Sequence, residues 1–166
     1  MKFLDEKFRK YPAKYILQCI LASITVLVIL VFLDVVNETA IIGALGATTF
    51  IVFTTPKRYS SDSKRLIGGY SVGLIVGYIF YLISKNYILI DNKIMLITSA
   101  ALAVGFASFL MSLTNTEHAP AAGISLGLVL NQWDHTTIIF ILGAVAWLWI
   151  VKKTLNPWLM NLISPK

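Results

Sequence analysis

The sequence predicts an all-α membrane protein, a polytopic helical bundle with about six membrane segments. Of its 166 residues, 57% are hydrophobic and only 13% are charged, whereas an average soluble domain is about 45–50% apolar and about 25% charged. The apolar residues form runs separated by short polar connections. Since each crossing needs about 20 residues, we expect residues 1–166 to form a single transmembrane domain.

Four of the apolar runs have the length of a spanning helix, namely residues 15–33, 66–84, 94–113 and 136–151. The first run lacks the short core and small-residue cleavage site of a signal peptide, so we expect the mature protein to keep it. Residues 155–166 follow as a short cytoplasmic tail. Within it, residues 155–163, with Pro157 and Trp158, are expected to lie along the membrane surface as an amphipathic segment.

The charges indicate an orientation. Basic residues flank the first run, fill residues 57–65 and close the last run at Lys152 and Lys153, whereas the connection at residues 34–39 is acidic. By the positive-inside rule both termini are cytoplasmic, in what we expect to be a bacterial plasma membrane. The net charge of +6 then reflects topology, and no nucleic acid is expected as a partner. The cluster at residues 57–65 has a second interpretation, attraction of anions to the cytoplasmic mouth.

Two further apolar segments are too short to cross. Residues 40–55 would span about 24 Å as a helix and residues 119–130 about 18 Å, against a hydrocarbon thickness of about 30 Å. Gly43 and Gly46 weaken the first segment as a helix. We therefore expect two short broken or half helices that enter the membrane.

These segments suggest an internal repeat. Each half of the chain, residues 15–84 and 94–152, contains two long spans with a short segment between them, and the halves begin on opposite sides. Residues 44–48 align with residues 121–125 as Ala-x-Gly-x-hydroxyl. The pattern predicts a 3+3 inverted repeat of the transporter type, with a binding site at the broken segments.

Helix N-termini near the midplane would form an anion site, because their unpaired N–H groups carry partial positive charge. Small residues let an ion approach the backbone, hydroxyl groups donate hydrogen bonds, and an imidazole donates and titrates near neutrality. The polar groups are few, which favours a small inorganic anion or a protonated weak acid. The predicted substrate-binding residues are His118, Ala121, Ala122, Gly123, Ser125, Gly46, Ala47, Thr48 and Thr49.

The neighbouring residues have alternative interpretations. Glu117 is expected to pair with His118, to cap a helix end or to carry a proton, unless it is a solvated interfacial carboxylate. His118 could be a simple helix cap, since Pro120 suits a first helical turn. Glycines at positions 69, 73 and 77 form a stripe for close helix packing. This stripe and the small size of the chain also suggest a homo-oligomer.

Residues 117–123, preceded by Leu113 and Thr114, resemble the motif that names the HPP family of integral membrane proteins. Upstream, residues 46–48, then Phe53 and Pro56, then residues 66–70, are similar in order and spacing to further elements of that family. The resemblance extends from about residue 43 to residue 143. Members of this family have been implicated in nitrite transport, and the resemblance implies the same activity here.

The chain departs from the family pattern at three places. Ala119 replaces the first of two prolines, Ala122 and Gly123 invert the usual order, and Tyr70 replaces a histidine. The loss of that histidine weakens the carry-over of a two-histidine site to this chain.

Three classes of function follow from the sequence. The first is a transporter or channel for a small inorganic anion, nitrite above all, or for another small anion or weak acid. The second is a membrane scaffold or subunit that transports nothing. The third, an enzyme, is not expected, because His118 and Glu117 lack a nucleophile or a metal-ligand set at a recognisable spacing. The single Cys19 excludes a cysteine-only metal cluster, and we expect no metal and no cofactor.

Overall fold

The computed structural model describes residues 6–31, 39–89, 93–131 and 133–163. All regular structure within these residues is helical: α1 (Glu6–Lys10), α2 (Pro12–Val31), α3 (Thr39–Thr54), a 3-10 turn (Tyr59–Ser61), α4 (Ser63–Leu89), α5 (Lys93–Thr114), α6 (Ala119–Leu130) and α7 (His135–Leu155). By length and composition, α2, α4, α5 and α7 can each cross a membrane, whereas α3 and α6 are apolar but shorter. The prediction of a polytopic all-α bundle is confirmed.

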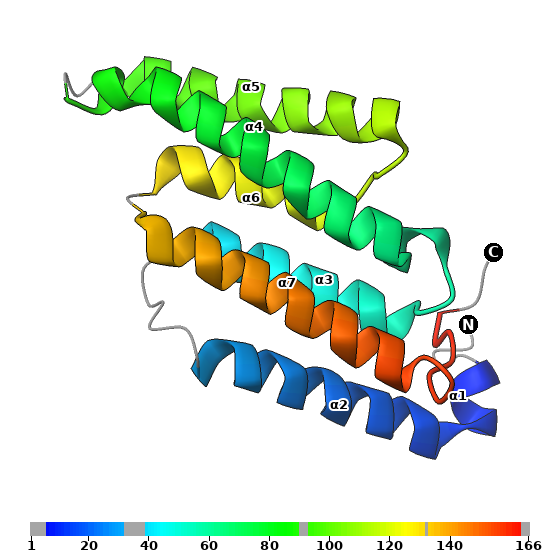
Figure 1. Ribbon diagram of the computed structural model, residues 1–166. Helices are drawn as coiled ribbons and strands as arrows, with labels where there is room; N and C mark the ends of the chain where they lie inside the picture. The colour runs from blue at the N-terminus through cyan, green and yellow to red at the C-terminus, as the bar shows by residue number, and fades with distance from the viewer. Residues whose placement is uncertain (1–5, 32–38, 90–92, 132, 164–166) are drawn as a thin grey trace.

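The short helix α6 lies at the centre of the bundle. It contacts α3, α4 and α5, and most of its residues are buried. In Figure 1 the α4–α5 pair lies on one side of it, α3 and α7 lie on the other side, and α2 forms the outer layer beyond them. Therefore α6 is enclosed by protein rather than exposed to lipid.

Glycines of α4 allow α6 to pack closely. A Cβ atom at Gly73 would lie 2.3 Å from the Ala121 carbonyl oxygen, and one at Gly69 would lie 2.6 Å from the His118 Cβ. Both separations are shorter than van der Waals contact, so only glycine fits. The glycine stripe is thus used inside the chain, and it offers no argument for a homo-oligomer.

The helix α3 differs from the sequence expectation. It runs without a break through Gly43 and Gly46, from Thr39 to Thr54. Glycine in a helix costs only about 1 kcal/mol, whereas an unpaired backbone group in hydrocarbon costs several kcal/mol. The helix therefore remains intact. Similarly, α4 continues to Leu89 rather than ending at Ser84, because Lys85 does not break a helix.

The C-terminal segment also differs from the expectation of an amphipathic segment that lies along the membrane surface. Leu159 and Leu162 are buried, and Leu159 packs with α2 and α3 residues. The buried Gln18 side chain donates to the carbonyls of Phe53 (2.6 Å) and Met160 (3.0 Å). The Leu162 N–H donates to the last carbonyl of α3 at 2.8 Å. The segment folds back because the end of a helix leaves carbonyls without intrahelical partners.

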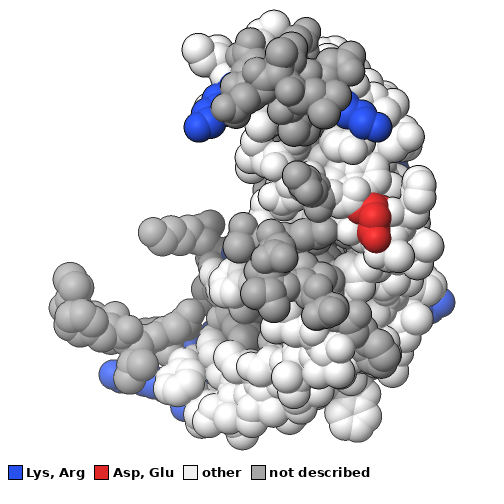
Figure 2. Space-filling view, turned by 90° about the vertical axis from the view of Figure 1, so that its left-hand side faces the viewer, with Lys and Arg blue, Asp and Glu red and all other residues white. Residues whose placement is uncertain are grey.

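Positive charge is concentrated at one end of the bundle, which we call the basic end: α1, residues 57–65 and the last turn of α7. This end is on the right in Figure 1. Figure 2 shows the opposite end, where few of the described residues are charged. The acidic connection expected at residues 34–38 lies outside the described residues.

Candidate functional site

The approach to α6 begins where α5 ends. Asn115 has a positive φ of 54°, a conformation that asparagine adopts more readily than most residues. The Thr116 N–H donates to the Met111 carbonyl at 2.9 Å and the Asn115 N–H to the Ser112 carbonyl at 3.3 Å, the pattern of a Schellman motif. The asparagine thus stops α5 and turns the chain inwards.

The connection between α5 and α6 directs its side chains to opposite sides. His118 has extended dihedral angles (φ −144°, ψ 94°), and successive side chains of an extended chain face opposite ways. The His118 residue is only 2% exposed, whereas the Glu117 side chain is 48% exposed. Glu117 accepts a hydrogen bond from the Tyr59 hydroxyl at 3.0 Å and lies 3.9 Å from the Arg65 Nε. Its partners are therefore Tyr59 and Arg65, not His118.

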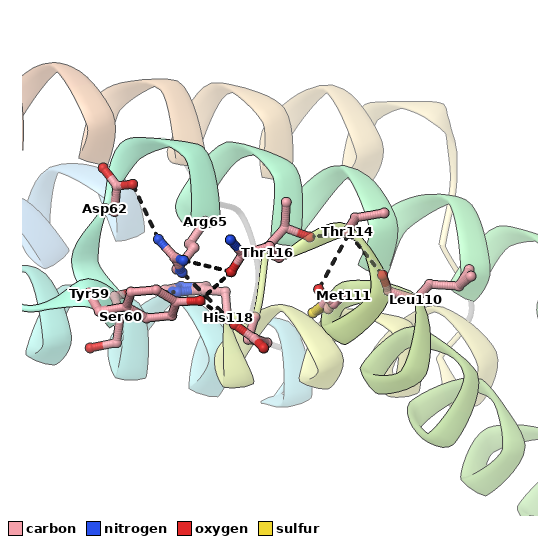
Figure 3. Close-up of polar contacts among 11 residues, drawn as sticks. Tyr59, Ser60, Asp62, Arg65, Leu110, Met111, Thr114, Thr116 and His118 are labelled. Carbon is pink, nitrogen blue, oxygen red and sulfur yellow. Dashed lines mark hydrogen bonds and ion pairs between the residues drawn. The ribbon is translucent and has the colours of Figure 1, made fainter.

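His118 is the centre of a buried hydrogen-bond chain. Its Nδ1 lies 3.2 Å from the Ser60 carbonyl oxygen (Figure 3). Its Nε2 lies 3.0 Å from the Thr48 Oγ1, which is 2.7 Å from the Tyr70 hydroxyl. A carbonyl only accepts, so Nδ1 carries a proton. In the neutral ring, Thr48 then donates to Nε2 and Tyr70 donates to Thr48.

The hydrogen bonds of this cluster can also run in the opposite direction. The Tyr70 hydroxyl also lies 3.3 Å from the Ala44 carbonyl oxygen. If Nε2 gains a proton, it donates to Thr48, Thr48 donates to Tyr70, and Tyr70 donates to Ala44. Every group keeps a partner in both directions. The cluster of His118, Thr48 and Tyr70, which we call the His118 cluster, can therefore accommodate a proton without leaving a buried polar group unpaired.

The other predicted residues of α6 pack rather than join this cluster. Ala121 faces the α4 glycines, and Gly123 faces Ala44 of α3. The Ser125 hydroxyl donates to the Ala122 carbonyl at 2.7 Å, within its own helix. These small residues allow α6 to approach its neighbours closely.

Of the four predicted α3 residues, only Thr48 reaches His118. Ala47 is exposed, and Gly46 and Thr49 line an apolar groove between α2 and α3. The Thr49 hydroxyl donates to the Leu45 carbonyl at 2.9 Å. Successive residues of an α-helix point about 100° apart, so four in a row cannot face one site. Because α3 is continuous here, the N–H groups of residues 46–49 are bonded within the helix, and the N-terminus of α3 lies at Thr39 rather than beside these residues.

The N-terminus of α6 is near His118 but offers few backbone donors. Pro120 has no N–H, and the Ala121 N–H donates to the His118 carbonyl at 2.9 Å. The donors that distinguish this place are therefore the side chains of the His118 cluster.

Sequence reasoning missed Arg65, which holds the connection in place. Arg65 is 5% exposed. Its guanidinium bonds to Asp62 at 3.3 Å and to the Asn115 Oδ1 at 2.7 Å, and it stacks on the Tyr59 ring (Figure 3). Arg65, one turn before Gly68 and Gly69, was interpreted as part of a basic cluster that sets topology or attracts anions, and not as a structural anchor. Its position at the start of a glycine-rich helix was the available clue.

Tyr70 was noticed only as a departure from the family pattern, and Lys152 only as part of the basic ending of the last span. Tyr70 is 1% exposed and Lys152 is 7% exposed. A lysine inside the last turn of a spanning run is a signal that a topology argument overlooks.

Among the residues that the structure describes, no group of three His, Cys, Asp or Glu side chains is placed to hold a metal ion.

Comparison with known proteins identifies the family of this chain. A search of curated proteins and a search of solved structures each found no match. Residues 8–160 match the family described as HPP, transmembrane region, so the chain is an integral membrane protein that belongs to the HPP family.

Proposed function

We propose that this protein transports a small inorganic anion, nitrite, across the membrane, and that the ion is held at the His118 cluster. The observation that carries the proposal is the burial of an imidazole and two hydroxyl groups among apolar helices. His118, Thr48 and Tyr70 are each at most 2% exposed. An ionisable residue such as histidine is costly inside a membrane bundle, and residues of this kind mark substrate and ion pathways.

The chemistry of the cluster suits an oxyanion. Thr48 and Tyr70 each have a hydroxyl proton, and a protonated Nε2 of His118 adds a third donor. Nitrite would replace the hydrogen bond that joins Thr48 to His118 at 3.0 Å. Because hydrogen bonds to a charged acceptor are stronger than neutral ones, the exchange favours the bound ion.

Transport requires the cluster to open, since His118 is enclosed. We infer that the two halves are inverted repeats that move against each other. The pattern of contacts supports this: α6 contacts α4 of the first half, α3 contacts α7 of the second half, and the two short helices contact each other. In transporters of this kind, substrate binds between the repeats, where alternating movement exposes it to each side.

We further propose that the basic end is cytoplasmic, in a bacterial plasma membrane. The support is the concentration of lysine and arginine at that end, as the positive-inside rule requires. Both termini would then be cytoplasmic. Tagging the C-terminus with a reporter that is active only in the cytoplasm tests this orientation.

The choice of nitrite rests on the family, because the three donors would suit any small oxyanion or its weak acid. Competition decides among them. Uptake of nitrite into proteoliposomes would be measured with nitrate, formate and chloride as competitors. Stronger inhibition by one of these than by unlabelled nitrite would assign the site to that ion.

The decisive variant is His118→Ala, and His135→Ala is its matched control. His135 begins α7 on an exposed surface. We expect His118→Ala to lower the initial rate of nitrite uptake by about tenfold or more, because it removes one charge-assisted hydrogen bond to the ion. His135→Ala should leave the rate unchanged. Uptake that is absent from the parent protein would favour the scaffold or subunit alternative. Uptake that His118→Ala does not change would remove His118 from the pathway.

A further inference from the structure

A second cavity lies at the basic end. It has a volume of about 470 Å³ and is formed by the segment between α3 and α4, the start of α4 and the last turn of α7. Its charged lining residues are Lys57, Arg58, Arg65, Lys152, Lys153 and Asp62. Among the described lining residues, five cations thus face one carboxylate. We call this cavity the basic pocket.

The carboxylate in the basic pocket is already engaged. Asp62 bonds to the Arg65 guanidinium at 3.3 Å, and its side chain is 53% exposed. Arg65 also donates to Asn115 at 2.7 Å. Asp62 thus pairs with Arg65, and among the described residues no carboxylate lies within 4.0 Å of the ammonium groups of Lys57, Lys152 or Lys153.

Lys152 is the least solvated of these remaining cations. It is only 7% exposed, and no described carboxylate lies within 4.0 Å of its ammonium group. A cation withdrawn from water is costly unless an anion accompanies it. By contrast, Lys153 is exposed and lies over the Trp149 ring at 4.9 Å. Among the described residues, Lys152 therefore has no carboxylate in direct contact with it.

The basic pocket is also adjacent to the His118 cluster. Arg65 lines the pocket and also contacts Glu117, the neighbour of His118. An anion in the pocket would therefore lie beside the connection that positions His118.

We propose that the basic pocket is a binding site for a phosphate group, with Lys152 as its innermost contact. A phosphate group has two or more unbridged oxygens that accept hydrogen bonds, and as a free phosphate or monoester it has close to two negative charges at pH 7. It can therefore contact several cations at once, which a small anion such as nitrite does less well. The phosphate group comes either from a soluble compound or from the head group of an anionic lipid, since basic pockets between membrane helices suit both. This site does not depend on the proposed transport function.

The test uses the full-length protein in nanodiscs. In the first arm the lipid is neutral phosphatidylcholine only, and inorganic pyrophosphate is titrated in by calorimetry. In the second arm phosphatidylglycerol is included, and the lipid that stays bound is measured by native mass spectrometry. Saturable binding in the first arm assigns a soluble source, and retention of phosphatidylglycerol with no pyrophosphate binding assigns a lipid source.

The variant Lys152→Gln removes the buried charge, and Lys64→Gln is its matched control. Lys64 is exposed, lies in the first turn of α4 and does not line the basic pocket. We expect Lys152→Gln to raise the dissociation constant of the ligand that binds, pyrophosphate or phosphatidylglycerol, by about tenfold or more. Lys64→Gln should leave this constant within about twofold of the parent value. Lys57→Gln, at an exposed position of the pocket wall, serves as a second variant if Lys152→Gln does not fold, with an expected loss of a few-fold.

Two results would overturn the proposal. One is the absence of both pyrophosphate binding and phosphatidylglycerol retention in the parent protein. The other is an equal loss in the pocket variants and in Lys64→Gln, which would indicate a diffuse surface charge rather than a site. Neither result concerns nitrite uptake, so the transport proposal is tested separately.

Discussion

The two short helices, α3 and α6, have similar small-residue sequences but different surroundings. α6 follows an extended connection and packs against glycines of α4 at distances that exclude a Cβ atom. α3 is an ordinary continuous helix, and a Cβ atom at Gly43 or Gly46 would meet nothing within 4 Å. A shared small-residue pattern therefore does not determine a shared structure. The neighbouring helix and the preceding residues decide it.

The same comparison explains how the His118 cluster is assembled. The second half of the chain contributes the imidazole, at the N-terminus of α6, and the first half contributes Thr48 of α3 and Tyr70 of α4. The cluster therefore lies between the halves rather than inside either one. Any movement of one half against the other must change these contacts.

The largest effect is expected from alanine at a packed glycine compared with an open one. In Gly73→Ala the new Cβ would lie 2.3 Å from a backbone oxygen of α6, so α6 or α4 must shift, at a cost of about 1–3 kcal/mol or more in unfolding free energy. Gly46→Ala should instead be neutral or stabilise the protein by up to about 1 kcal/mol. Unfolding in mixed detergent micelles measures both. Equal stability of the two variants would show that α4 and α6 do not pack as closely as described.

A smaller effect is expected at the start of α4. Arg65→Gln removes the charged contacts that hold Asn115 and Asp62, and should lower the unfolding free energy by about 1–3 kcal/mol. The adjacent, exposed Lys64→Gln should change it by less than about 0.5 kcal/mol. The same micelle assay applies, and protease cleavage at residues 115–117 should increase only in Arg65→Gln. Similar behaviour of the two variants would mean that Arg65 does not anchor the connection.

The smallest effect on stability is expected at the start of α7. Asp134 caps this helix, whereas Asp62 pairs with Arg65. Hydrogen bonds from the Thr136 hydroxyl and the Thr137 N–H hold the pKa of Asp134 below its ordinary value of 3.8. Since the folded state has the lower pKa, the stabilisation is complete above about pH 4 and is lost as the pH falls through the lowered pKa. Asp134→Asn should therefore melt slightly below the parent protein at pH 7, and the gap should close under acidic conditions. A gap that widens in acid would contradict this cap.

Much of the fold was predictable from composition, run length and charge. The four long runs, the two short apolar segments and the position of Pro120 at the start of α6 all follow from hydrophobicity and helix-capping rules. The continuity of α3 was not predictable in this way. Two glycines destabilise a helix, but unpaired backbone groups in apolar surroundings cost more free energy, and only the tertiary structure shows what those surroundings are.

The candidate site was predictable only in part. His118 and Thr48 were identified from their residue types, and the structure brings them together. Tyr70 was not identified as a site residue, because its role depends on which face of α4 meets α3. Lys152 was not identified either, because its burial depends on how α7 packs against the segment between α3 and α4. Such tertiary contacts have no local signature in the sequence.

We propose that the His118 cluster holds the transported ion, and a comparison of Thr48→Val with Thr49→Val isolates the contribution of one hydroxyl group of this cluster. The two threonines are adjacent and buried, but only the Thr48 hydroxyl contacts His118, since that of Thr49 donates within its own helix. Initial rates of nitrite uptake would be measured in proteoliposomes with equal amounts of folded protein. We expect Thr48→Val to lower the rate by about tenfold and Thr49→Val to leave it within about twofold. Equal rates in the two variants would contradict the assignment of the ion to this cluster.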